Sequence, residues 1–274
     1  MLELTYARGI IVQYEMWDRF DYARDVWERN PFRPVNNVNY SVAESGLKNN
    51  YPDHPGNNAN PFFRSVPKRD NNEVILKYQH KHIDRVLAIS LKYPNVLYCM
   101  DNETGANADW GAYWSVYIKE KAKALGVVVQ TTEMWDDWNL RGAQHRHTLD
   151  HPEQYSFVDT SQNNQKKGQV HWDNLQWVRQ YLLEKGFVRP INHVKDYGAD
   201  GGHFGNDQDA VERFWRTLVG GGASIRFHRP THGLGLSPKA QANIKSARLF
   251  TEAFDLTQAT PGNDPANITE VEEN

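Results

Sequence analysis

The stretch of sequence best suited to chemistry is Asp101-Asn-Glu-Thr104, where two carboxyl groups and an amide directly follow an apolar run. That run, Val96-Leu-Tyr-Cys-Met100, predicts a buried strand that ends at these side chains. A carboxyl group at a partly buried rim has its charged form disfavoured, so its pKa rises towards the range of a general acid. We therefore expect Glu103 to protonate a leaving oxygen and Asn102 to hold a substrate hydroxyl. The alternative is that Glu103 only caps or pairs with the following loop.

The elements that must position these residues are six β-rich runs that alternate with amphipathic stretches, as in repeated β–α units around a parallel sheet. The predicted strands are 9–17, 95–101, 127–135, 155–160, 190–197 and 222–228, and the predicted helices are 73–92, 110–125, 171–185, 207–219 and 238–254. A closed β/α barrel has eight such units. The fold class is therefore α/β, with either a six-unit doubly wound sheet or a TIM-barrel-like fold without its first quarter.

Two segments outside this alternation stand out. Residues 18–72 are polar and rich in proline and asparagine, and structureless loops of that length in a compact domain usually serve a function. Residues 257–274 contain four acids and no lysine or arginine, which predicts a disordered tail. We expect residues 1–256 to form one barrel-like catalytic domain.

Polar and aromatic side chains concentrate at the carboxyl ends of the predicted strands, where parallel β/α folds place their sites. Aromatic residues make up 12% of the chain, which suits a surface that stacks on sugar rings, although the same side chains also fill cores. Arg226 or His228 would bind the carboxylate of an anionic sugar. The alternative is that these side chains pair with neighbouring acidic residues. The predicted substrate-binding residues are Asn102, Trp17, Glu133, Trp135, Asn192, Lys195, Tyr197, Arg226 and His228, with Trp110, Trp114 and Trp138 as further stacking candidates.

The segment Val-Leu-Tyr-Cys-Met-Asp-Asn-Glu at 96–103 resembles the fourth-strand signature of clan A glycoside hydrolases, in which the Asn-Glu pair carries the acid/base. The likeness to apiosidase-like barrels covers about residues 9–254. It implies a barrel that lacks its first two strand–helix units, a carbohydrate substrate and a secreted or periplasmic setting.

The resemblance departs from the family pattern at the second carboxylate. Retaining members of the clan present a glutamate nucleophile at the end of strand seven, where this chain has Lys195, followed by Asp196. A protonated lysine cannot attack an anomeric carbon as a carboxylate does. We expect Asp196 to be the second carboxylate, with Glu133 and Glu15 as alternatives.

Composition excludes several classes of protein. With 31 basic and 34 acidic residues the net charge is −3, which argues against a binder of nucleic acids or anionic membranes. The single cysteine excludes an intrachain disulfide framework, and we find neither a signal peptide nor a membrane-spanning run. His145, His147 and His151 lie in a predicted loop without an orienting strand, so we predict no metal and no cofactor.

Two functions fit these observations. The first is a glycoside hydrolase that uses Glu103 and Asp196. The second is a carbohydrate-binding pseudoenzyme, which Lys195 and the two missing strands favour. If the chain is a fragment of a longer enzyme, its open barrel edge would expose apolar surface, and we expect a second copy of the chain to cover it.

Overall fold

The strands of the computed structural model form two sheets of three strands each. The first sheet has the order β1 (Val12–Asp18), β2 (Val96–Asn102), β3 (Gln130–Thr132). The second has the order β4 (Val158–Asp159), β5 (Ile191–Asp196), β6 (Ser224–Phe227). Neighbouring strands run parallel, as the pairings β1–β2, β2–β3 and β5–β6 show. The α/β class and the six predicted strands are confirmed.

The structure describes residues 1–56, 58–197, 205–228 and 236–262. Across these residues the strands do not close into a barrel. The chain divides into two compact units, Met1–Val158 and Asp159–Asn274.

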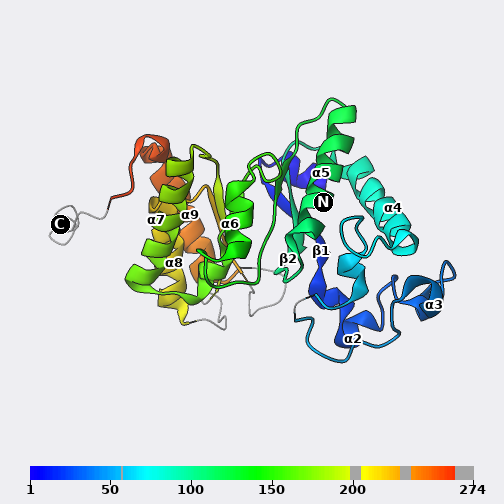
Figure 1. Cartoon of the computed structure of the whole chain (residues 1–274). Helices are drawn as coiled ribbons and strands as arrows, with labels where there is room; N and C mark the ends of the chain where they lie inside the picture. The colour runs from blue at the N-terminus through cyan, green and yellow to red at the C-terminus, as the bar shows by residue number, and fades with distance from the viewer. Residues whose placement is uncertain (57, 198–204, 229–235, 263–274) are drawn as a thin grey trace. The chain divides into compact units, whose positions relative to one another are not determined.

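Two long helices dominate the first unit, α4 (Glu73–Ser90) and α5 (Ala108–Ala124), and both agree closely with their predicted ranges. Figure 1 shows them beside β1 and β2. The unit also contains α1 (Leu2–Tyr6), α2 (Arg24–Trp27), α3 (Val42–Ser45) and α6 (Ala143–Asp150).

The prediction of a loop around His145, His147 and His151 was wrong, because residues 143–150 form the helix α6. Histidine and threonine are weak helix formers, so local propensity favoured a loop. The helix instead buries His145, Thr148 and Leu149 on one side, and this packing outweighs propensity.

Short helical turns organise the polar segment 18–72, which is therefore not structureless. They are η1 (Arg19–Tyr22), α2, η2 (Pro34–Asn36), α3 and η3 (Pro61–Arg64). Asparagine side chains cap several turns: Oδ1 of Asn30 accepts from the Phe32 amide, and Oδ1 of Asn60 accepts from the Phe62 amide. The abundance of asparagine thus reflects the many turns that need a local acceptor.

In the second unit, α7 (Gly168–Lys185), α8 (Asp207–Val219) and α9 (Pro238–Ala253) accompany β4–β6, with η4 (Ser161–Gln165) after β4 (Figure 1). The bounds of α8 match the prediction at both ends. A capping box between Asn206 and Asp209 stabilises its N-terminus. The first residues of the predicted tail join the turn η5 (Leu256–Gln258). Residues 263–274 of that tail lie outside the described residues.

An aromatic core stabilises the first unit. Trp17 at the end of β1 meets Trp110 and Trp114 of α5, with ring centroids 5.6–6.2 Å apart, and none of the three is more than 3% exposed. Phe62 of η3 joins the cluster 5.1 Å from Trp17. In this structure these tryptophans fill the core, so their rings present no face on which a sugar could stack.

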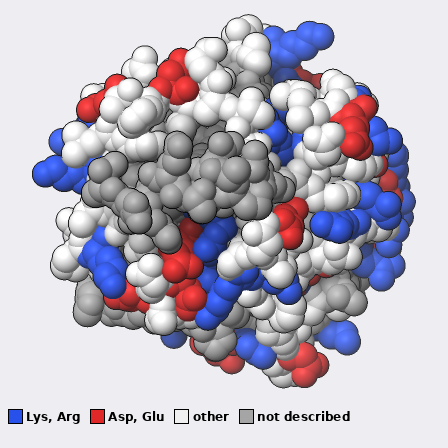
Figure 2. Space-filling model, turned by 90° about the vertical axis from the view of Figure 1, so that its left-hand side faces the viewer, with Lys and Arg blue, Asp and Glu red and all other residues white. Residues whose placement is uncertain are grey.

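No helix in the described ranges is long and apolar enough to cross a membrane. On the face shown in Figure 2, lysine and arginine side chains are interspersed with aspartate and glutamate.

Gly111 provides a test of how tightly this unit is packed. A Cβ added to this residue of α5 would lie 2.9 Å from Cδ of Glu133 and 3.1 Å from Oη of Tyr155. We expect Gly111→Ala to lower the free energy of unfolding by about 1–3 kcal/mol in urea denaturation, since overpacking a filled core is costly. Helix propensity alone predicts the opposite sign, a gain of about 1 kcal/mol. A stabilised variant would therefore contradict this packing.

Candidate functional site

The carboxyl ends of β1 and β2 bring polar side chains together, as the sequence predicts. Asp18 and Asn102 are register partners at the ends of these two parallel strands. Nδ2 of Asn102 donates to Oδ2 of Asp18 at 3.0 Å. This contact orients the amide of the residue that precedes Glu103.

Glu103 lies immediately beyond this pair and is partly exposed. Its φ of 50° places it in the left-handed region, which is unfavourable for a residue with a Cβ. The next residue holds the turn in place: Thr104 donates its amide to the Met134 carbonyl at 2.7 Å and accepts from the Asp136 amide at 2.9 Å. Backbone strain that neighbours enforce in this way is typical of functional sites.

Asp101, the last buried residue before this turn, is fully enclosed. Burial raises the pKa of its carboxyl from 3.8 to about 7, while hydrogen bonds from Thr104 and Asn58 act in the opposite direction. Its backbone amide donates to Oε1 of Glu133 at 2.9 Å. Oδ1 of Asp101 has no hydrogen-bond partner in the described part of the chain. This environment favours the protonated acid.

Asn58 connects the segment 48–63, which is distant in sequence, to the turn at Glu103 through hydrogen bonds. Its Nδ2 donates to Oδ2 of Asp101 at 2.9 Å and to Oγ1 of Thr104 at 3.0 Å, and its Oδ1 accepts from the Gly105 amide at 3.2 Å. Asn58 is buried and also has a left-handed backbone, with φ 52°. One side chain therefore bonds to the residues on both sides of Asn102 and Glu103.

Arg19 provides a second connection between this segment and the sheet. Its guanidinium donates to the Gly56 carbonyl and forms an ion pair with Asp136, which follows β3. The side chain of Arg19 is 1% exposed and that of Asp136 is 33% exposed. Sequence reasoning missed both Arg19 and Asn58, because the only signal was the length and polarity of 18–72.

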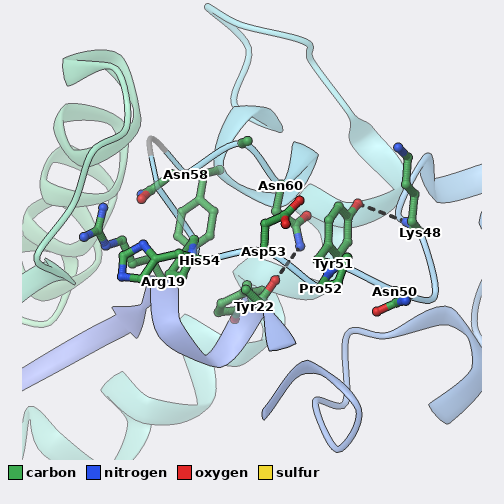
Figure 3. Close-up of a pocket in the computed structure, with 14 residues that line it drawn as sticks. Arg19, Tyr22, Lys48, Asn50, Tyr51, Pro52, Asp53, His54, Asn58 and Asn60 are labelled. Carbon is green, nitrogen blue, oxygen red and sulfur yellow. Dashed lines mark hydrogen bonds between the residues drawn. The ribbon is translucent and has the colours of Figure 1, made fainter. Parts of the chain in front are cut away.

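A cavity of about 180 Å³ lies between η1 and the segment 48–63. Figure 3 shows Arg19, His54 and Asn58 at one end and Lys48 and Asn50 at the other. Tyr22, Tyr51 and Phe63 provide its aromatic lining. Because Asn58 both lines the cavity and bonds to the Glu103 turn, the cavity adjoins the carboxyl edge of the first sheet.

Three of the predicted substrate-binding residues of this unit are buried. Trp17 is 3% exposed, and Glu133 and Trp135 are each 1% exposed. Nε1 of Trp135 donates to Oγ1 of Thr148 at 2.8 Å. These three side chains therefore pack in the interior beneath the carboxyl edge of the first sheet and are not exposed to a ligand. Of the tryptophans singled out from the sequence, Trp138 is 54% exposed and follows β3.

The second unit holds Asp196, the predicted second carboxylate. Oδ1 of Asp196 lies 3.2 Å from Nε of Arg213 on α8, and both side chains are 0% exposed. Arg213 also donates to the Tyr197 carbonyl at 2.5 Å. The carboxylate of Asp196 is therefore directed at α8 and paired with a permanent cation.

The other predicted residues of this unit differ in exposure. Asn192, Lys195 and Tyr197 are all buried, at 3–4% exposure. Arg226 is exposed and its Nη1 donates to the Val194 carbonyl at 3.4 Å. The half-buried ring of His228 packs edge-on against Tyr197 at 4.9 Å.

Two buried histidines form a pair that sequence reasoning did not identify. The rings of His171 on α7 and His193 on β5 lie 5.7 Å apart. Burial lowers the pKa of His171 to about 2 and that of His193 to about 4. Both are neutral near pH 7, and each disfavours the folded state as the pH falls below the ordinary histidine pKa of 6.5.

Within the described ranges, no group of three or more histidine, cysteine, aspartate or glutamate side chains is arranged to hold a metal ion. No protein-family model, curated protein or solved structure matches this chain.

The buried carboxyl of Asp101 predicts a specific pH dependence of stability. Because its pKa is higher in the folded chain, its contribution is fully present below pH 3.8 and is lost as the pH rises through about 7. Asp101→Asn keeps the shape and removes the ionisation. We expect the stability of the variant relative to the wild type to increase by about 2–3 kcal/mol between about pH 5 and about pH 8.

Urea unfolding of both proteins at each pH measures this difference. His171 and His193 titrate in both proteins, so their effect cancels in the subtraction. A difference that stays constant with pH would show that Asp101 is ionised throughout.

Proposed function

We propose that this protein is a glycoside hydrolase built on an incomplete, TIM-barrel-like arrangement of β/α units, with Glu103 as its acid/base. The observation that carries the proposal is the position of Glu103: a partly exposed carboxyl on an enforced left-handed turn, at the carboxyl edge of a parallel sheet. Sites of parallel β/α folds lie at this edge. The resemblance of residues 96–103 to the clan A signature supports the same assignment.

In the proposed reaction Glu103 protonates the glycosidic oxygen as the bond to the anomeric carbon breaks. Asn102, which Asp18 orients, holds a hydroxyl of the sugar next to that bond. If Asp196 acts as nucleophile, it bonds to the anomeric carbon as the leaving group departs, and Glu103 then takes a proton from the water that displaces it; if Asp196 acts as base, Asp196 takes that proton as the water attacks directly. The net reaction consumes one glycoside and one water.

Asp196 is the proposed second carboxylate, acting as nucleophile or base. The guanidinium of Arg213, 3.2 Å away, favours the charged form of this carboxyl, which either role requires. No cofactor enters this mechanism.

One observation favours a second candidate, a carbohydrate-binding protein without hydrolytic activity. Asp196 is 0% exposed and the adjacent Lys195 is 4% exposed, so the region where retaining relatives would present a nucleophile is enclosed. Such a protein would bind sugars through the same edge and release no product.

Glu103→Gln tests the assignment on a panel of aryl glycosides and oligosaccharides. Removing an acid catalyst costs about 100-fold or more in kcat, and the loss should be greatest for poor leaving groups, which need the proton most. Binding of the intact substrate should change little, since the amide keeps the shape of the carboxyl. Glu120→Gln, an exposed residue of α5, is the matched control.

Turnover by Glu103→Gln equal to that of the wild type would end the assignment. Asp196→Asn tests the second carboxylate: normal turnover in that variant would remove Asp196 from the mechanism. Calorimetric sugar binding by the wild type without any product in chromatography would select the binding protein instead.

A further inference from the structure

The cavity beside the Glu103 turn has a wall in which Arg19, Asn58 and Asn60 each form hydrogen bonds within the protein. Arg19 bonds to Gly56 and Asp136, and Asn58 bonds to the Glu103 turn. Asn60 donates to the Tyr22 carbonyl at 3.1 Å, as Figure 3 shows. These side chains shape the cavity, and Nε of Arg19 is a buried donor among them that has no hydrogen-bond partner in the described residues.

The rim of the cavity, in contrast to the wall, has polar side chains that are exposed. Lys48, Asn50, Asp53 and His54 come from one exposed stretch between α3 and η3. Within the part of the chain that the structure describes, the side chains of Lys48, Asn50 and Asp53 have no hydrogen-bond or ion-pair partner. Only Nδ1 of His54 is engaged, accepting from the Gly56 amide at 3.1 Å. A ligand would therefore be recognised by these rim groups.

The charges of this rim favour a neutral ligand. Among the described lining residues, one unpaired ammonium, Lys48, stands against one unpaired carboxylate, Asp53, and the guanidinium of Arg19 is neutralised by Asp136. An anion would meet the carboxylate of Asp53, while the charge of Arg19 is already balanced by Asp136. A polyhydroxylated molecule, in contrast, can donate to Asp53 and accept from Asn50 and Lys48.

The volume of the cavity and its aromatic lining further restrict the class of ligand. A volume of about 180 Å³ is below the 300–1,000 Å³ that is typical of sites for drug-sized molecules, so the cavity suits one small ring. Tyr22 and Phe63 line its interior, and the half-buried ring of Tyr51 offers an aromatic face. A ring with an apolar face and polar edges fits this combination.

We propose that this cavity binds one neutral sugar ring of the substrate and that Asn58 couples the bound ring to the turn that carries Glu103. The identification of the ring as a sugar rests on the proposed function. Asn58 is a positioning residue in this scheme, because it lines the cavity and bonds to Asp101, Thr104 and Gly105. Asp53 and Asn50 determine which ring is accepted.

Calorimetric titration of the full chain with D-glucose, D-galactose, D-xylose and D-glucuronate tests the ligand class without any need for turnover. We expect at least one neutral sugar to bind more tightly than D-glucuronate. Asp53→Asn and Asn50→Ala should each weaken that sugar about tenfold, whereas Asp173→Asn, an exposed carboxylate on α7, should leave it unchanged.

Several results would overturn the inference: no binding of any neutral sugar, tighter binding of D-glucuronate, or unchanged affinity in both rim variants. Hydrolysis by the wild type combined with rim variants that bind and cleave normally would refute this subsite and leave the proposed function intact. Binding that the rim variants weaken, in a protein without turnover, would support the subsite and refute the hydrolase.

Discussion

A carboxyl group enclosed at the end of β2 constrains the edge of the sheet around it. Asp101 has no exposed surface and forms no ion pair with any residue that the structure describes, so burial favours its protonated form. Asn58 donates to Oδ2 of Asp101 and Glu133 accepts from its backbone amide, whereas Oδ1 has no hydrogen-bond partner among the described residues. The same Asn58 then fixes Thr104 and the strained turn between them, so the position of Glu103 depends on this buried acid.

The second unit meets the same electrostatic problem in a different way. Asp196, also at the end of a central strand and also fully buried, pairs with the guanidinium of Arg213. A carboxyl next to a permanent cation stays charged, whereas one held by amide and hydroxyl donors in an apolar setting becomes neutral near pH 7. Two buried aspartates in similar elements therefore have different partners: amide and hydroxyl donors surround Asp101, and a guanidinium pairs with Asp196.

The sequence predicts the regular part of this fold well and the site only in part. The six strands and the five long helices were recognisable because apolar periodicity depends on local spacing, and α8 even carries its caps in sequence. The helix α6 and the turns of 18–72 escaped prediction, because tertiary packing and asparagine caps stabilise them. Trp17 illustrates the limit for function: its position at a strand end indicated a stacking surface, but only its contacts with Trp110 and Trp114 reveal a core residue.

The site residues differ in predictability for the same reason. Asn102 and Glu103 follow a strand directly, so their place at the edge could be derived from the run before them. Asn58 lies 43 residues from Asp101 in the chain, and no local pattern marks it. Long-range hydrogen bonds of this kind are set by the fold as a whole.

The geometry of β2 also explains why two acids so close in sequence have different properties. Along a regular strand, residues 101 and 103 would point to the same face and share one environment. The left-handed backbone at Glu103 ends the extended conformation, so this alternation no longer applies. Asp101 remains inside, where its proton stabilises the packing, and Glu103 emerges at the edge with access to solvent. The left-handed backbone at a single residue thus separates a buried carboxyl from one at the exposed edge of the sheet.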